Sequence, residues 1–222
     1  MLYVIPTPIW NLDDITLRAL KLFKELKYFI CEDTRTFKNL LRAYDIDFSD
    51  KKFFSLTSYT DPGVIKKYIN LIKENDVWLV SEAGTPGLSD PGKELIKHCW
   101  QEGIDFEVLP GANALIPAVV ASCFPTDKFC FYGFLPQKKG REKILKEILT
   151  NNKAVFFYES VHRLKKLFNQ LNKLEFRWKI FIWRELTKKF QQYLCWDFEE
   201  IYYKLQKWDL ILKWEFVVWI FK

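Results

Sequence analysis

Histidine and glycine are scarce in this chain of 222 residues, which contains 2 histidines and 8 glycines. The phosphate-binding motifs GxGxxG and Walker A are absent, as are the zinc motif HExxH and the nucleophile motif GxSxG. His98 and His162 alone offer little to a histidine-rich metal site or a histidine-based triad. We therefore expect a protein that works without a bound metal ion.

Disulfide and membrane signals are missing as well. The 5 cysteines are odd in number and form no CxxC pair, which argues against a disulfide framework and for a reducing compartment. No apolar run approaches the ~20 residues of a membrane span, and the N-terminus lacks the basic and apolar regions of a secretion signal. The sequence predicts a soluble, cytoplasmic protein with no membrane partner.

The remaining composition is that of a globular protein, with 49% hydrophobic and 28% charged residues. The length suffices for one large domain or two smaller ones with real cores. A net charge of +6 is a mild basic bias, which permits a polyanionic partner such as RNA without demanding one.

Tryptophan is unusually frequent, since its 9 residues outnumber the glycines. Trp10, Trp196, Trp208 and Trp214 occupy turn-like positions, where the access of glycine to positive φ would suit the backbone. Added together, the two residue types give about the ordinary glycine share of ~7%. We interpret many of these tryptophans as UGA codons read as glycine in the source organism. The alternative is an aromatic-rich protein from an AT-biased genome.

Short apolar runs alternate with amphipathic segments through the first half of the chain. Strands are predicted at residues 2–5, 28–31, 53–56, 77–80 and 106–109, each followed by a helix. Five βα units indicate a mainly parallel sheet with helices on both faces. The second half is also α/β, with antiparallel pairing and hence a mixed sheet. A turn cluster at 124–127 separates them, which predicts domains at 1–124 and 125–222.

The stretch 77–103 combines a buried strand, a long loop with two glycines, and a helix started by Asp90 and Pro91. The loop exceeds the ~2–6 residues of an ordinary βα connection, which favours a binding loop. Small and polar residues also follow other predicted strands, at Thr7-Pro8, 32–35 and 110–113. Parallel sheets bind ligands at the carboxyl ends of their strands, so we expect these segments to meet there.

Seven stretches occur in this order: TPIWNLDDITLRAL, CEDTR, SEAGTPGLSDPG, LPGANALIPA, GFLP, FYESVHRL and RELTK. Together they resemble the ribosomal RNA small subunit methyltransferase I family, within the tetrapyrrole-methylase superfamily, over essentially the whole chain. The resemblance implies a two-domain tetrapyrrole-methylase-like fold with S-adenosylmethionine in the cleft between the domains. It also implies a homodimer that methylates a cytidine 2′-oxygen in the decoding region of 16S rRNA. Trp10 stands where the family has glycine in TPIGN, and Trp214 stands where a GEF turn is expected.

The resemblance places cofactor-binding residues in the strand-end loops and early in the second domain: Pro8, Ala83, Gly84, Thr85, Pro86, Ser89, Asp90, Pro110, Gly111, Ala114, Phe134 and Leu135. Small residues there let the backbone approach the cofactor, while Phe134 and Leu135 form an apolar wall for its adenine. Methyl transfer is an in-line displacement that needs a positioned hydroxyl and benefits from a base. Asp33, Glu159 and Glu185 remain open as that base.

Contacts to RNA phosphates are expected from six cations: Arg35, Lys138, Lys139, Arg141, Arg163 and Lys188. The substrate is either naked 16S rRNA or the small ribosomal subunit. Two other functions remain open. One keeps the fold and cofactor but methylates a tetrapyrrole or another small acceptor. The other is a non-enzymatic RNA-binding assembly protein whose cofactor site is blocked by Trp10.

Overall fold

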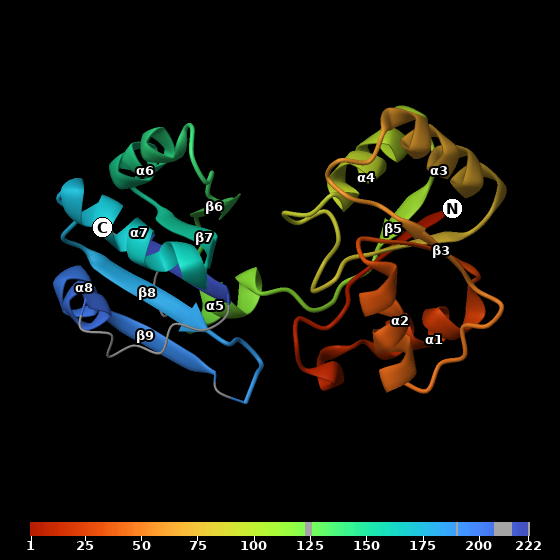
Figure 1. Cartoon of the computed structure of the whole chain (residues 1–222), viewed down its shortest axis with the longest axis horizontal. Coiled ribbons are helices and arrows are strands. Elements are labelled where there is room, and N and C mark those ends of the chain that lie inside the picture. The colour runs from red at the N-terminus through yellow and green to blue at the C-terminus, as the bar shows by residue number, and fades with distance from the viewer. Residues whose placement is uncertain (123–125, 190, 207–214, 222) are drawn as a thin grey trace. The chain divides into compact units, whose positions relative to one another are not determined.

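The contacts within the chain divide it into two units, Met1–Asn113 and Ala114–Lys222. The structure is a computed structural model that describes residues 1–122, 126–189, 191–206 and 215–221 (Figure 1). The division falls before helix α5 (Leu115–Ala121), whereas the boundary predicted from the turn cluster follows that helix. Within the described residues, no helix is both long and apolar enough to cross a membrane.

The first unit is built on a five-stranded sheet in the order β3-β2-β4-β1-β5. Its strands are β1 (Leu2–Ile5), β2 (Tyr28–Cys31), β3 (Lys52–Ser55), β4 (Val77–Val80) and β5 (Phe106–Val108). All neighbouring strands are parallel, as the repeated βα pattern predicts. The carboxyl ends of the strands therefore share one edge of the sheet, and their loops are brought together there.

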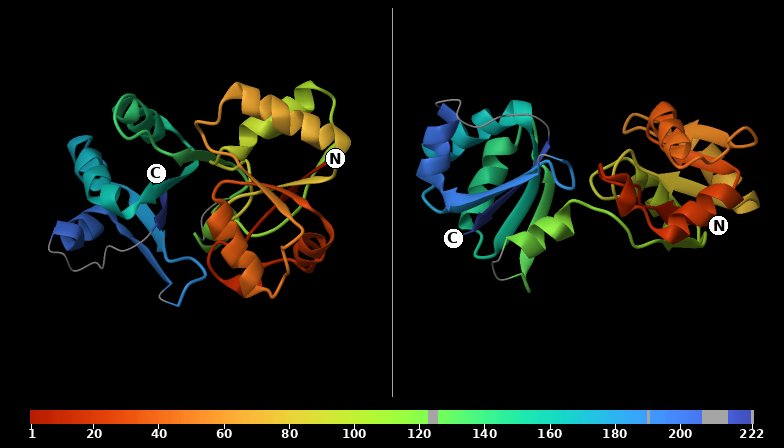
Figure 2. Two further views of the ribbon diagram at one scale, coloured as in Figure 1. Left: turned by 45° about the vertical axis from the view of Figure 1, so that its right-hand side comes forward. Right: turned by 90° about the horizontal axis from the view of Figure 1, so that it is seen from below.

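Helices cover both faces of this sheet because successive strand residues point to opposite sides. In β4, Val77 and Leu79 pack with α3 and α4, while Trp78 and Val80 pack with α1 and α2. Figure 2 shows these two helix layers from further directions. The helices are η1 (Leu12–Asp14), α1 (Leu17–Glu25), α2 (Thr34–Ala43), α3 (Pro62–Glu74) and α4 (Gly92–Gln101).

Side-chain caps decide where the first two α-helices begin. The sequence predicts Asp13 or Asp14 as the cap of α1, but those residues lie in the 3-10 helix η1. Thr16 caps α1 instead, and its hydroxyl accepts a hydrogen bond from the amide of Ala19. Asp33 caps α2 by accepting from the amides of the second and third residues of that helix.

The second unit has a mixed five-stranded sheet in the order β6-β7-β10-β8-β9. β6 and β7 are parallel and the other neighbours are antiparallel, so the sheet is mixed, as predicted. The strands are β6 (Phe129–Phe134), β7 (Ala154–Ser160), β8 (Lys179–Arg184), β9 (Gln192–Asp197) and β10 (Glu215–Phe221). β9 was not predicted; it is an edge strand, in which the buried Leu194 lies between the exposed Tyr193 and Cys195.

Three helices, α6 (Arg141–Thr150), α7 (Val161–Lys173) and α8 (Phe198–Gln206), pack on one face of this sheet. Leu167 and Phe168 of α7 meet Val155 and Phe157 of β7 in one continuous hydrophobic cluster. Helix α5 lies on the other side of the sheet (Figure 2). The core of this unit thus holds β7 and α7 rigidly, and both elements carry residues of the candidate site.

Candidate functional site

The loops after β1 and β4 are joined at the carboxyl edge of the first sheet. Thr7 and Gly84 exchange two backbone hydrogen bonds, each 3.0 Å long. The Thr7 hydroxyl, which is buried, donates to the carbonyl of Ser81, and the Ser81 hydroxyl donates to the carbonyl of Gly84. With every polar group of this contact paired, the two loops form one rigid piece.

The loop after β5 is held against the same piece. The Thr85 hydroxyl donates to the carbonyl of Ala112 over 3.1 Å. A Cβ atom on Gly111 would lie only 2.6 Å from Cβ of Pro6, so no other residue permits this approach. Gly84 has a left-handed φ of +83°, and a Cβ there would lie 3.2 Å from Cγ2 of Ile9. Three loops therefore meet through backbone that carries almost no side chain.

The structure brings most of the predicted cofactor-binding residues of the first unit into these loops. Pro8, Gly84 and Pro86 are buried in them, and Ala83 and Pro110 are exposed beside them. Thr85, Asp90 and Gly111 are half-buried, and Ser89 is exposed with a left-handed φ of 72°. Ala114, Phe134 and Leu135 belong to the second unit.

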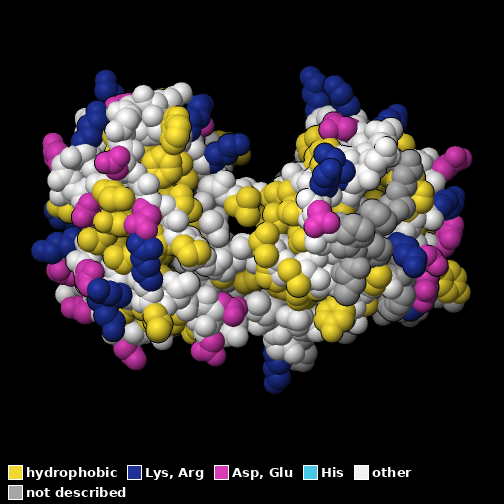
Figure 3. Space-filling model, turned by 180° about the vertical axis from the view of Figure 1, so that it is seen from behind, with side chains coloured by type: hydrophobic (Ala, Val, Ile, Leu, Met, Phe, Trp, Pro, Cys, Tyr) yellow, Lys and Arg dark blue, Asp and Glu magenta, His cyan; other side chains and the backbone are white. Residues whose placement is uncertain are grey.

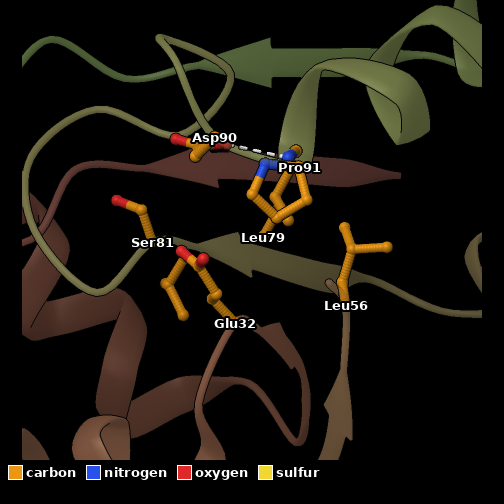
Figure 4. A pocket seen from close by; sticks show the side chains of 8 residues that line it. Glu32, Leu56, Leu79, Ser81, Asp90 and Pro91 are labelled. Carbon is orange, nitrogen blue, oxygen red and sulfur yellow. Dashed lines mark hydrogen bonds between the residues drawn. The ribbon is translucent and has the colours of Figure 1, made fainter. Parts of the chain in front are cut away.

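A small pocket, with room for about one water molecule, lies beside this edge, between the ends of β2, β3 and β4 and the start of α4. Glu32, Ser81 and Asp90 gather at one end of it, and Leu56 lies at the other (Figure 4). Asp90 accepts hydrogen bonds from the amides of Gly87 and Gly92, both 2.8 Å long. Asp90 thus accepts from the first amide of α4, but the N-cap of this helix is Pro91, one residue later than the predicted cap at Asp90.

Two carboxyl groups in this pocket have raised pKa values. Burial raises the pKa of Glu32, and the neighbouring charges of Glu82 and Asp90 raise it further. Burial also raises the pKa of Asp90, although its two amide donors oppose the shift. Among the described residues, this pocket included, His, Cys, Asp and Glu side chains form no group of three or more that could hold a metal ion.

In the second unit, a buried ion network joins the start of α6, the end of β7 and the start of α7. Glu159 is 0% exposed, and its two oxygens pair with Arg141 at 2.5 Å and Arg163 at 2.8 Å. Arg141, only 2% exposed, also donates to Gln170 and to the carbonyl of Pro136. The network is fully paired, as buried charges must be.

Comparison with known proteins assigns the chain to a family, because residues 1–202 match the tetrapyrrole (corrin/porphyrin) methylases. The chain belongs to this family. It is 42% identical over 211 residues to the ribosomal RNA small subunit methyltransferase I of Hydrogenobaculum sp. (strain Y04AAS1), covering 93% of this chain and 89% of the relative. The protein of the same name from Thermotoga maritima is 40% identical over 193 residues, 86% of each chain. The predicted resemblance is confirmed.

Solved structures confirm the predicted fold of this tetrapyrrole methylase. The native uroporphyrin III C-methyl transferase of Thermus thermophilus superimposes with a TM-score of 0.66 at 13% identity, over 100% of this chain and 97% of the other. Diphthine synthase superimposes with a TM-score of 0.68 at 11% identity, over 99% and 89%. At such identities the similarity concerns the fold alone.

The three carboxylates considered as a base sit in very different surroundings in this methylase. Asp33 is bound by the Arg35 side chain and by two helix amides, and these hydrogen bonds lower its pKa to about 2. Glu159 has no exposed surface, and both of its oxygens are engaged by arginines. Asp33 is therefore too weakly basic, and Glu159 is fully paired and inaccessible to solvent, so both are poor proton acceptors.

Glu185 lies in a strained turn after β8. Its φ is +57° and that of Thr187 is +63°, conformations that a β-branched residue such as threonine rarely adopts. The Glu185 carboxylate pairs with Lys188 at 3.0 Å, and both side chains are largely buried. The Thr187 hydroxyl and Nε of Arg184 are also buried there, with no hydrogen-bond partner among the described residues. Strain and unpaired polar atoms of this kind concentrate at functional sites.

The six cations predicted to contact phosphates fall into two groups. Arg35, Lys138 and Lys139 are exposed, although Arg35 also pairs with Asp33. Arg141, Arg163 and Lys188 are instead committed to buried carboxylates, and Arg141 has no surface left for a phosphate. On the face shown in Figure 3, Lys and Arg side chains are interspersed with Asp and Glu side chains.

Sequence reasoning placed Thr7 at a strand end without its contact to Ser81, and it did not single out Ser81 or Gln170, whose side chains help to hold the loops and the ion network. A signal existed for Arg141, because Leu145 and Ile148 follow it at helical spacing and are buried on the same face. The basic stretch before α6 concealed this signal, because its other cations are solvated.

Proposed function

We propose that this tetrapyrrole methylase transfers a methyl group from S-adenosylmethionine to the 2′-oxygen of a cytidine in the decoding region of 16S rRNA. The observation that carries the proposal is the meeting of three loops through the side-chain-free positions Gly84 and Gly111. It is supported by relatives that are named as rRNA methyltransferases at 40–42% identity over most of their length.

The loop edge suits a sulfonium nucleoside. When bound, S-adenosylmethionine supplies a methyl group activated by its positive sulfur. Gly84 and Gly111 let the three loops pack closely, against Ile9 and Pro6, so that backbone groups meet at one edge, and fixed carbonyl dipoles suit a cation. In the first unit we assign the cofactor to Pro8, Ala83, Gly84, Thr85, Pro86, Ser89, Asp90, Pro110 and Gly111. In the second unit we assign it to Ala114, Phe134 and the backbone of Leu135, whose own side chain is buried in the core.

Glu185 is our choice for the group that receives the proton of the ribose hydroxyl. The support is twofold: Asp33 and Glu159 are engaged in capping and in the buried network, and Glu185 sits in a strained turn. The Lys188 ammonium holds the carboxylate in one orientation at 3.0 Å. Lys188 engages only Oε1 of Glu185, whereas both oxygens of Glu159 are engaged, so Glu185 keeps an oxygen for the proton.

Arg35, Lys138 and Lys139 are the cations that we propose to contact rRNA phosphates, because their side chains are exposed. We further propose that the protein acts in the cytoplasm on the small subunit, as a homodimer. The apolar side chains of Ile116 and Val120 support the dimer, since they stand one turn apart on α5 and are 51% and 72% exposed.

Incubation with methyl-tritiated S-adenosylmethionine tests the proposal. Unmodified small subunits, naked 16S rRNA and a uroporphyrinogen are offered as acceptors in parallel. We expect label in RNA, in a dinucleotide that resists alkali because its 2′-oxygen is blocked. Label in the porphyrinogen instead would establish a small-molecule methyltransferase. A blocked RNA-binding protein would give no label, and S-adenosylhomocysteine would not raise its melting temperature.

A further inference from the structure

Three consecutive carbonyl groups after β6 each accept a hydrogen bond from a different cationic side chain. Arg163 donates to Leu135 over 3.3 Å, and Arg141 donates to Pro136 over 3.2 Å. Lys166 donates to Gln137 over 3.4 Å. A short segment outside any helix or strand is thus anchored residue by residue from α6 and α7.

Glu159 is the common partner of the two arginines. Arg141 pairs with one of its oxygens and Arg163 with the other, and Arg163 also donates to the hydroxyl of Ser160. The two guanidinium groups are planar forks, so each bridges the carboxylate and one carbonyl with a defined geometry. Through the two arginines, Glu159 therefore helps to fix Leu135 and Pro136, while Lys166 holds Gln137 independently of it.

The residue that precedes this segment is an exposed aromatic. Between Phe131 and Phe134 the pairing of β6 with β7 shifts by one residue, at a bulge where Gly133 has a left-handed φ of 58°. The bulge turns the ring of Phe134 outward, where it is 43% exposed. One edge of the ring packs on Tyr158 at 5.2 Å between centroids.

We propose that Glu159 is a positioning residue which, through Arg141 and Arg163, holds segment 135–137 so that the Phe134 ring stacks on the adenine of the cofactor. The inference rests on the proposed use of S-adenosylmethionine. This role would explain why the network is charged. Hydrophobic side chains of similar volume would fill the same space with equal or greater stability.

A double-mutant cycle on S-adenosylhomocysteine affinity, measured by calorimetry, tests the proposal. Phe134→Leu removes the stacking face and should weaken binding roughly tenfold. Arg163→Lys keeps the charge beside Glu159 but loses the fork, and should weaken binding about fivefold. The double variant should bind no more weakly than Phe134→Leu, within about twofold, because Arg163 acts through the ring.

Arg177→Lys is the matched control, since Arg177 likewise pairs with one carboxylate, Glu199, and donates to one carbonyl, that of Phe176. Its affinity should stay within about twofold of the unsubstituted protein. Should Arg163→Lys not fold, Lys166→Met loosens the same segment from an exposed position and should weaken binding about twofold.

Additive effects of Phe134→Leu and Arg163→Lys on the affinity would overturn the inference. Unchanged affinity in Arg163→Lys, or in Lys166→Met if Arg163→Lys does not fold, would also overturn it. Either result leaves the proposed function standing if the unsubstituted protein binds S-adenosylhomocysteine. If that protein binds none, the proposed function fails and this inference fails with it. In the absence of cofactor, we also expect the amides of residues 137–140 to exchange faster in Arg163→Lys than in Arg177→Lys.

Discussion

Thr7 and Gly84 donate to each other's carbonyls across 3.0 Å, and this pair of hydrogen bonds is the shortest link between the loops after β1 and β4. Both hydrogen bonds join backbone groups, so they do not depend on the side chain of either residue. What the link requires is a left-handed residue at position 84 with no Cβ pressing on Ile9. The link between these two loops therefore depends on Gly84.

Gly84→Ala should weaken S-adenosylhomocysteine binding more than tenfold and lower the free energy of unfolding by about 1–2 kcal/mol. Alanine at a φ of +83° is strained, and its Cβ would press on Ile9. Gly103→Ala is the control: its φ is +64°, but no atom lies within 4 Å of the added Cβ. Urea unfolding should show a similar backbone cost in Gly103→Ala, and calorimetry should show its cofactor affinity intact. Equal affinity loss in both variants would contradict the assignment of the loops.

Glu185→Gln should lower kcat for methyl transfer by about 10²–10⁴ while leaving S-adenosylhomocysteine affinity within about twofold. Glutamine keeps the shape of the side chain and cannot take up the proton. Asp33→Asn is the comparison, because asparagine caps a helix as well as aspartate does, so α2 and kcat should both be preserved. Single-turnover kinetics on small subunits measures the rate of methyl transfer by both variants. A large loss in Asp33→Asn with none in Glu185→Gln would transfer the role to Asp33.

Glu159→Gln should destabilise the second unit by about 3–5 kcal/mol, because it leaves the buried guanidinium of Arg141 and the half-buried guanidinium of Arg163 without a counter-charge. Glu142→Gln removes a carboxylate from the same region, but Glu142 pairs with Lys146 on the exposed face of α6. Its cost should stay below about 0.5 kcal/mol. Circular dichroism during urea unfolding gives both values. A cost below about 1 kcal/mol for Glu159→Gln would mean that the network relaxes easily.

Apolar runs were enough to place the strands of the first sheet, because β4 and its neighbours are buried on both faces and read as continuous hydrophobic segments. Local chemistry also located the strand-end loops, through Gly84, Gly111 and the prolines around them. The sequence could not show which loop touches which: the contact of Gly111 with Pro6 joins residues far apart in the chain.

The charged residues of the second unit were the main failure of sequence reasoning. Arg141 was assigned to RNA because it follows two solvated lysines, and Glu159 was considered as a base because it ends a strand. Their pairing depends on α6 crossing the end of β7, which is a tertiary event. In β7, Phe157 and Glu159 share a face, so the alternation of the strand already indicated that this carboxylate points into the core.

Trp10→Gly should bind S-adenosylmethionine more tightly and be more active than the chain with tryptophan. The Trp10 side chain is 56% exposed at the end of the loop after β1. Trp100→Gly is a control, because this exposed tryptophan lies on α4, where glycine should cost about 1 kcal/mol of stability and leave affinity unchanged. Equal activity with either residue at position 10 would mean that the ring points away from the cofactor.

The gene should read UGA, not UGG, at positions 10, 196, 208 and 214. Trp208 and Trp214 lie outside the described residues, and the side chain of Trp196 is not described. Sequencing the DNA decides the matter, and UGG at these codons would exclude recoding.

Glu32→Gln should stabilise the first unit at pH 7 and have no effect at low pH. Because the folded pKa of Glu32 lies above its ordinary value of 4.5, the native state binds the proton more tightly than the unfolded state. Stability is therefore lost as the pH rises through the folded pKa, and a neutral side chain avoids that loss. The gain should stay below about 1 kcal/mol, since the residue is partly exposed and solvent screens its charge.

Glu102→Gln is the control of opposite sign, because the hydrogen bond from Lys73 lowers the pKa of Glu102. Its carboxylate stabilises the native state above the ordinary value of 4.5, and this contribution is lost as the pH falls through the lowered folded pKa. Urea unfolding at pH 7 should therefore find Glu32→Gln more stable, and Glu102→Gln less stable, than the unsubstituted protein. Both differences should shrink toward zero when the unfolding is repeated near pH 3. A Glu32→Gln variant that is less stable at pH 7 would show that the carboxylate has a favourable partner in the pocket.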